Sequence, residues 1–294
     1  MKNKQSIGVI MIIFTALLWS SNAPFVRWIS LDAFTVAGIR ALIAGVVLLP
    51  FARPKKINFN WYFLGFILCF FALTFGIIVA LKTTSSAIAL GMQYTSCILL
   101  FLISKPKRND FAITRIWPML LILVGVVISM CAKTKGSTLL GNLIALSTCF
   151  SFAGLTWFAK KLNTDNPIGL SSISNLILGV VALIIARPSG ETLLKVQTSE
   201  WLVLVYLGVF QIGISYALYY SGLRFVSSTT ASMIAPLEMI LGPIWTAIFL
   251  NEIPDLIGLI GFIIVIIGVV GEAIMMAYRE KKQKNENGKI TEKT

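Results

Sequence analysis

The sequence predicts an all-helical integral membrane protein in which ten transmembrane helices form two inverted five-helix repeats. Hydrophobic residues make up 57% of the chain and charged residues only 13%. Apolar runs of about 20 residues, the length that spans a bilayer as a helix, recur from end to end. Two halves of the chain also repeat one another. Together these features exclude an ordinary soluble domain.

The apolar runs define the helices and their connections. They predict helices at residues 6–28, 32–52, 61–82, 84–104, 113–132, 138–160, 167–187, 200–223, 226–250 and 254–278. Several connections are very short, so neighbouring helices are expected to be antiparallel. Residues 279–294 are polar and basic and predict a disordered tail near the membrane surface. The N-terminus resembles a signal peptide ending at Ala23, but its apolar run continues to Trp28, so we expect the helix to be retained.

Lysine and arginine are distributed asymmetrically between the two sides of the predicted membrane. With the N-terminus inside, 18 of them fall in cytoplasmic segments and six in outer segments. The positive-inside rule therefore predicts a multi-pass protein of the cell membrane with both termini in the cytoplasm. This distribution also accounts for the net charge of +13, so we expect no nucleic-acid partner.

Four sequence blocks occur once in each half, in the same order. They start at residues 8 and 141, at 52 and 186, and at 82 and 226, and they surround Gly125 and Gly268. We therefore predict repeats at residues 6–132 and 138–278, with extra residues of the second copy in the loop from Pro188 to Glu200. A unit with an odd number of helices must cross the membrane in the opposite sense when it is repeated.

The most specific pattern lies around the predicted ninth helix. Pro236, Leu237 and Glu238 follow Ala231, and the sequence AsnGlu at 251–252 precedes the run GlyPheIleIleValIleIleGlyValVal. The first helix contains Trp-Ser-Ser-Asn at 19–22 and the second contains Gly-Ile-Arg-Ala at 38–41. With these features, residues 6–278 resemble ten-helix transporters of the EamA type in the drug/metabolite transporter superfamily.

This resemblance implies a central cavity surrounded by helices 1, 3, 4, 6, 8 and 9, with export favoured over uptake. The first repeat departs from the pattern, because Met92 stands where Pro236 stands in the second repeat. The fourth helix also lacks the Asn-Glu ending. We therefore expect the two halves to contribute unequally to the site.

Glu238 is the candidate proton-coupling residue and a candidate substrate ligand. Pro236 and Pro243 interrupt its helix and free the carbonyls of Ser232 and Met239, which must face protein or a wet cavity. Glu238 lies about 18 Å into the helix, near the middle of a ~30 Å hydrocarbon core. Burial there favours the protonated carboxyl. The alternative is a fixed carboxylate that binds groups of the kinked helix and never titrates.

Polar groups in the first two helices are further candidates. Pro24 frees a carbonyl beside Trp19 and Asn22, which predicts a polar turn in the first helix. Packing between helices is the alternative reading of this turn. Arg40 lies about 12 Å into the second helix. It is either a counter-ion for an anionic substrate group or for Glu238, or a structural tie to carbonyls or a headgroup.

Aromatic, amide and hydroxyl side chains at membrane depth complete the predicted substrate-binding set. They are Gln93, Tyr94, Trp157, Gln211, Ser215 and Tyr216. Rings supply apolar walls and cation–π faces, while amides and hydroxyls orient polar groups of a small solute. For each residue taken singly, ordinary packing or an interfacial aromatic belt is the alternative.

The residue content argues against catalysis. The chain has no histidine, and its four cysteines lie in apolar segments without metal-ligand spacing. We therefore expect no enzyme activity, no metal and no cofactor. The expected partners are the lipid bilayer and a small-molecule substrate, and the nearly nonpolar fifth and tenth helices would be the contact of a homodimer.

Our hypothesis is a secondary transporter that moves a small organic metabolite, such as an amino acid or amine, by alternating access and in the direction of export. The alternatives are an uncoupled facilitator or exchanger, a scaffold without flux and, against the residue content, a membrane-embedded enzyme.

Overall fold

The computed structural model describes residues 2–52, 57, 59–103, 113–130, 138–226, 231, 234, 237–251, 255–268, 270–271 and 274. In the first half the elements are α1 Lys2–Ser20, α2 Asn22–Trp28, α3 Ala33–Leu48, η1 Leu49–Phe51, α4 Trp61–Thr83, α5 Ser86–Tyr94, α6 Ser96–Ile103 and α7 Ile113–Met130. In the second half they are α8 Leu139–Leu162, α9 Pro167–Ala186, α10 Gly190–Leu194, α11 Thr198–Tyr206, η4 Leu207–Ile214, α12 Ser215–Gly222 and α14 Leu237–Leu250. A further apolar helix spans Leu256–Gly268.

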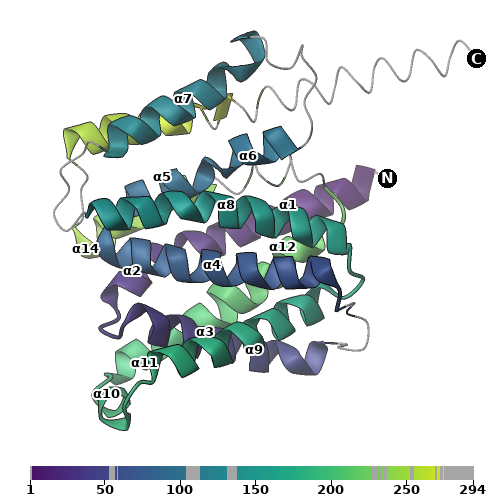
Figure 1. The fold of residues 1–294 in the computed structure, drawn as a ribbon, viewed down its shortest axis with the longest axis vertical. Coiled ribbons are helices and arrows are strands. Elements are labelled where there is room, and N and C mark those ends of the chain that lie inside the picture. Colours follow the sequence, from purple (N-terminus) through teal and green to yellow (C-terminus); the bar gives the residue numbers. More distant parts are fainter. Residues whose placement is uncertain are drawn as a thin grey trace, which may run out of the picture.

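The described residues form helices and short connections without a strand, which confirms the predicted all-helical class. Six helices are long and apolar enough to cross a membrane, namely Gln5–Trp28, Ala33–Phe51, Trp61–Thr83, Leu139–Leu162, Pro167–Ala186 and Thr198–Gly222. Four more apolar helices are shorter, so ten separate crossings stay a prediction. Figure 1 shows the long helices side by side, with the N-terminus and α10 at opposite ends of the bundle.

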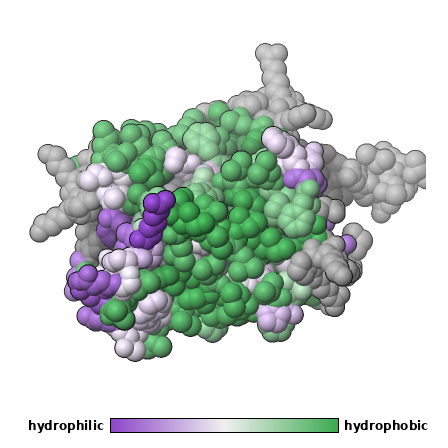
Figure 2. Space-filling model, turned by 60° about the horizontal axis from the view of Figure 1, so that its bottom comes forward, coloured by the Kyte–Doolittle hydropathy of each residue, from purple (hydrophilic) through white to green (hydrophobic). Residues whose placement is uncertain are grey.

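One face of the molecule is predominantly hydrophobic. Figure 2 shows a broad hydrophobic surface, with hydrophilic residues gathered mainly toward one end of it. Large apolar side chains such as Phe14, Leu68, Phe150 and Ile184 are more than half exposed. A contiguous apolar surface of this kind fits a hydrocarbon environment.

Glycines allow helices of the two halves to approach closely. A Cβ added at Gly38 or Gly45 of α3, or at Gly179 of α9, would lie 2.6–2.7 Å from a leucine side chain of the opposite helix. Helices α4 and α8 meet in the same way at Gly65 and Gly154. Small residues at such contacts let backbones pack tightly, which is the common mode of association inside a bilayer.

Three of the apolar segments, two long and one shorter, are irregular at polar positions. The first is broken at Ser21, between α1 and α2, which confirms the polar turn predicted before Pro24. Another is broken at Thr95, between α5 and α6. The segment Thr198–Gly222 changes to π-helix over η4, which contains Gln211 and has no counterpart in the predictions.

The ninth predicted helix is described only in part. Pro243 lies inside α14 and does not end it. Pro236, to which the sequence also assigns a break, lies outside the described residues, so that break stays a prediction. Glu238, in the first turn of α14, is described and buried.

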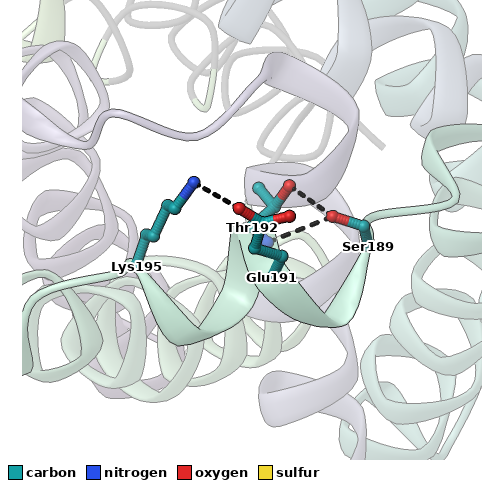
Figure 3. A network of polar contacts seen from close by, with 4 residues as sticks. All are labelled: Ser189, Glu191, Thr192 and Lys195. Atoms are coloured by element: carbon teal, nitrogen blue, oxygen red, sulfur yellow. Dashed lines mark hydrogen bonds and ion pairs between the residues drawn. The ribbon is translucent and has the colours of Figure 1, made fainter.

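The loop between α9 and α11 carries the short helix α10, within the stretch predicted to hold extra residues. Figure 3 shows its polar contacts: the Ser189 hydroxyl accepts a hydrogen bond from the backbone N–H of Thr192, and Lys195 pairs with Glu191 at 2.6 Å. Both members of this ion pair are about three-quarters exposed, so the pair adds little to stability.

Candidate functional site

A buried cavity lies among helices of both halves. It is lined by Trp19, Asn22, Arg40, Leu73, Thr74, Ile77, Gln93, Phe152, Gln211, Ile212, Tyr216 and Glu238. Its volume is about 30 Å³, room for no more than a few water molecules. Ligand pockets are typically about 300–1,000 Å³. The cavity is therefore smaller than a typical small-molecule pocket.

Arg40 of α3 is held in the cavity by two neutral amides. Its Nη1 donates to Oδ1 of Asn22 at 2.7 Å and to Oε1 of Gln211 at 3.3 Å. Only 2% of the residue is exposed. Within the described part of the chain, Arg40 forms no ion pair with Glu238. The direct counter-ion contact considered from the sequence is therefore absent, and Arg40 ties α2 to η4.

The π-helical segment positions Gln211 against Arg40. A Cβ added at Gly208 would lie 2.7 Å from Ile43 and 2.8 Å from the Arg40 carbonyl oxygen, so η4 packs directly on α3. The Ser215 hydroxyl donates to the carbonyls of Gln211 and Ile212 and lies outside the cavity lining. Short π-helical stretches within helices often occur at functional sites.

Glu238 and Tyr94 are the second polar group of the site. The Tyr94 hydroxyl donates to Oε2 of Glu238 at 2.5 Å, which joins α5 of the first half to α14 of the second. Glu238 is 4% exposed and lines the cavity, whereas Tyr94 is buried and is not one of the lining residues. This short contact fixes the direction in which the carboxyl group points.

Aromatic rings form one wall of the cavity. Trp19 packs against Tyr216 and Tyr219 with ring centroids 5.0 and 5.1 Å apart, and against Phe152 at 6.2 Å. Three of these residues, Trp19, Phe152 and Tyr216, line the cavity. Such rings offer both an apolar surface and electron-rich faces.

Four cavity-lining residues carry buried polar atoms without a hydrogen-bond partner in the described structure. They are the indole Nε1 of Trp19, the guanidinium Nε of Arg40, the hydroxyl of Thr74 and the amide Oε1 of Gln93. Each such atom costs about 1–3 kcal/mol when it is left unsatisfied. Unsatisfied buried groups concentrated in one cavity indicate a place for water or a ligand.

Trp157, like Ser215 and Tyr94, is not among the residues that line the cavity. Trp157 lies on the opposite side of α8, where its ring is 6.2 Å from that of Tyr62 and 4.9 Å from that of Phe158. Lys161 lies one helical turn later, with its Nζ 5.6 Å from the Trp157 ring centroid. Helical rotation separates these residues from Phe152, which faces the cavity from the same helix.

Some lining residues have no mark in the sequence. Leu73, Ile77, Phe152 and Ile212 are apolar residues in apolar helices, and no pattern separates a cavity wall from ordinary packing. Thr74, the fifth lining residue that was not predicted, is an isolated hydroxyl in the middle of α4. Its polarity is the one feature in the sequence that could have identified it. Arg40 also adds the second predicted helix to the six that the resemblance places around the cavity.

Comparisons with known proteins identify the family. The EamA-like transporter family matches residues 6–131 and 139–272, one copy in each half. The chain is 25% identical to an uncharacterized transporter of Clostridium kluyveri, over 96% of each chain. It is 23% identical to the uncharacterized transporter YxxF of Bacillus subtilis, over 95% of this chain and 92% of that protein. One solved crystal structure shares the fold, with a TM-score of 0.66 and 18% identity over 94% of this chain and 99% of that chain. The chain belongs to the EamA-like transporter family and is a membrane transporter.

Proposed function

We propose that this protein is a secondary transporter that exports a small organic metabolite, such as an amino acid or amine, across the cytoplasmic membrane. Ten crossings would put both termini on the same side of the membrane, and the distribution of lysine and arginine favours the cytoplasmic side. The observation that carries the proposal is the cavity, in which a buried arginine and a buried carboxyl group meet residues of both halves. Isolated charges inside apolar helices are costly and typically mark a transport pathway.

The small size of the cavity and hydrogen bonds between the two halves at one end of the bundle support alternating access. At the end of the bundle that carries α10, the Thr84 hydroxyl donates to Asn142 at 2.5 Å and the Thr138 N–H donates to the Thr83 carbonyl at 3.0 Å. These bonds join the first half to the second. In the proposed orientation they close the outer side, so the substrate enters when the halves separate at the inner side.

Glu238 is the proposed site of proton coupling. A carboxyl group in the cavity, bonded to Tyr94, can exchange its proton for a substrate group as the two sides open in turn. The alternative is an uncoupled facilitator or exchanger that uses Glu238 only as a fixed ligand. Flux through wild type and Glu238→Gln in pH- and voltage-clamped vesicles separates them. Flux that follows the proton gradient in wild type, but is independent of it in a Glu238→Gln variant that keeps counterflow, supports coupling; flux that is independent of the gradient in wild type supports the alternative.

The transport function is tested by binding and then by flux. Amino acids, amines, nucleobases and sugars are screened for thermal stabilisation of the purified protein, because a ligand that binds the native state raises the Tm. A compound that binds is then followed by counterflow in proteoliposomes. We expect counterflow with wild type and with Tyr220→Phe, whose hydroxyl has no partner in the described structure, and its loss with Gln211→Ala. If no compound of any class binds or moves, a scaffold without flux explains the fold better.

A further inference from the structure

We propose that the cavity selects a small zwitterion and binds its two charged groups at separate residues, the carboxylate at Arg40 and the protonated amine at Glu238. This inference rests on the proposed transport function. It adds which chemical groups the substrate must carry, and which side chain binds each of them.

The anion-binding half is built around an arginine that contacts no acidic side chain among the described residues. The guanidinium keeps its charge at neutral pH, and its Nη1 is occupied by the neutral amides of Asn22 and Gln211. Its Nε has no partner in the described structure, and neither has the indole N–H of Trp19, another cavity-lining residue. Two unused donors and one buried positive charge match a carboxylate, which accepts hydrogen bonds at both oxygens.

The cation-binding half is built from acceptors. Glu238 lines the cavity with its carboxyl group, of which Tyr94 occupies one oxygen, Oε2. Gln93, next to Tyr94 in α5, has an amide Oε1 without a partner in the described structure. An ammonium group has three N–H donors and no acceptor. It can therefore donate to the other carboxyl oxygen of Glu238 and to Oε1 of Gln93. The faces of Trp19 and Tyr216 add an aromatic wall that favours a cation.

The two charges share the cavity without contacting one another. Arg40 and Glu238 form no ion pair within the described residues, although both line the same cavity and both lie close enough to Tyr216 to interact with it electrostatically. A cationic substrate would leave the charge of Arg40 without a counter-ion. An anionic substrate would leave Glu238 without one, and a neutral sugar would pair with neither residue. A zwitterion satisfies both. In the rival interpretation, the two residues balance each other through water and do not contact substrate.

Wild-type protein provides the first test, through compounds that differ in one charged group. Leucine is compared with leucinamide, which lacks the carboxylate, and with 4-methylpentanoate, which lacks the amine. The comparison is repeated with alanine, alaninamide and propanoate, and with phenylalanine, phenylalaninamide and 3-phenylpropanoate. Kd is obtained from thermal stabilisation at increasing concentrations. In at least one series we expect the amino acid to bind about tenfold or more tightly than both relatives, because each relative leaves one buried charge unpaired.

Two results of this comparison overturn the inference. One is an amide or a des-amino acid that binds as tightly as its amino acid in every series. The other is binding and counterflow of a sugar or nucleobase while no amino acid binds, which leaves the transport function standing. Failure of every compound in the wider screen contradicts the transport function and this inference together.

Variants assign the two groups to their residues. We expect Arg40→Gln to shrink the preference for leucine over leucinamide and to keep the preference over 4-methylpentanoate, with Glu238→Gln doing the reverse. Tyr220→Phe is the control that changes neither. Equal loss of both preferences in each variant, or no loss in Arg40→Gln, contradicts the assignment and favours the water-bridged pair. The wild-type series decides the main point even where Arg40→Gln does not fold.

Discussion

At the scale of single residues, the site is defined by which buried polar groups are satisfied and which are not. The Tyr94 hydroxyl is bonded to Glu238, whereas the equally buried Tyr220 hydroxyl has no partner in the described structure. The sequence places Tyr94 but not Tyr220 in the predicted binding set, yet nothing in it shows which of the two hydroxyls has a partner. Their difference comes from tertiary contacts between α5 and α14 that no local pattern encodes.

This difference predicts that replacing tyrosine by phenylalanine changes the free energy of unfolding differently at the two positions. Tyr94→Phe removes a hydrogen bond to a carboxyl group and should lower the free energy of unfolding by about 1–3 kcal/mol. Tyr220→Phe removes a hydroxyl that is already unsatisfied and should be neutral or slightly stabilising. Thermal unfolding of the two variants in one detergent compares them directly. Equal Tm values for both would show that the Tyr94 contact contributes nothing.

At the scale of the elements, glycine positions decide how close the helices lie around the cavity. Gly208 places the π-helical segment η4 against the backbone of α3, and this contact brings Gln211 within reach of Arg40. In contrast, a Cβ at Gly91 of α5 meets no described atom within 4 Å. The break at Ser21 is predictable because Pro24 follows it by three residues, but η4 contains no proline that would mark the change to π-helix.

Two matched substitutions test the role of this packing. Gly208→Ala should lower the Tm and weaken substrate binding, because its Cβ would displace η4 from Ile43 and move Gln211. Gly91→Ala should be neutral or stabilising by about 0.5–1 kcal/mol, since alanine favours a helix over glycine. The measurements are Tm and the Kd of a metabolite found in the screen. Wild-type affinity in Gly208→Ala would mean that η4 does not position the site.

At the scale of the whole molecule, hydrogen bonds across the end near α10 hold the two halves together. Thr84 and Asn142 form the most buried of these contacts between α4 and α8. The helical class, the apolar faces and most of the cavity residues follow from hydropathy and from the cost of polar groups in lipid. Helix rotation determines the size of the cavity, the position of Trp157 and which apolar residues form the cavity wall. The sequence does not specify this rotation, because its helices carry apolar residues on all sides.

The closing contact predicts a shift between conformations. Thr84→Val removes the hydroxyl that donates to Asn142 and should favour opening at the outer side. We expect faster reaction of a cysteine introduced at Thr74 with a membrane-impermeant thiol reagent added from outside, by about threefold or more for a loss near 1 kcal/mol. Ser189→Cys on the exposed loop serves as the control that reacts at an unchanged rate. An unchanged rate at Thr74→Cys would show that this contact does not govern access.

Substrate protection of the cavity is the most direct test of the central claim that the transported molecule occupies the space between Arg40 and Glu238. In a background without native cysteines, Thr74→Cys is labelled with the impermeant reagent in the presence and absence of a metabolite that shows counterflow. Lys195→Cys on α10 is the reference. We predict that the metabolite slows labelling at Thr74→Cys and leaves Lys195→Cys unaffected. Labelling at Thr74→Cys that never occurs from either side, or that saturating metabolite does not slow, would contradict the account.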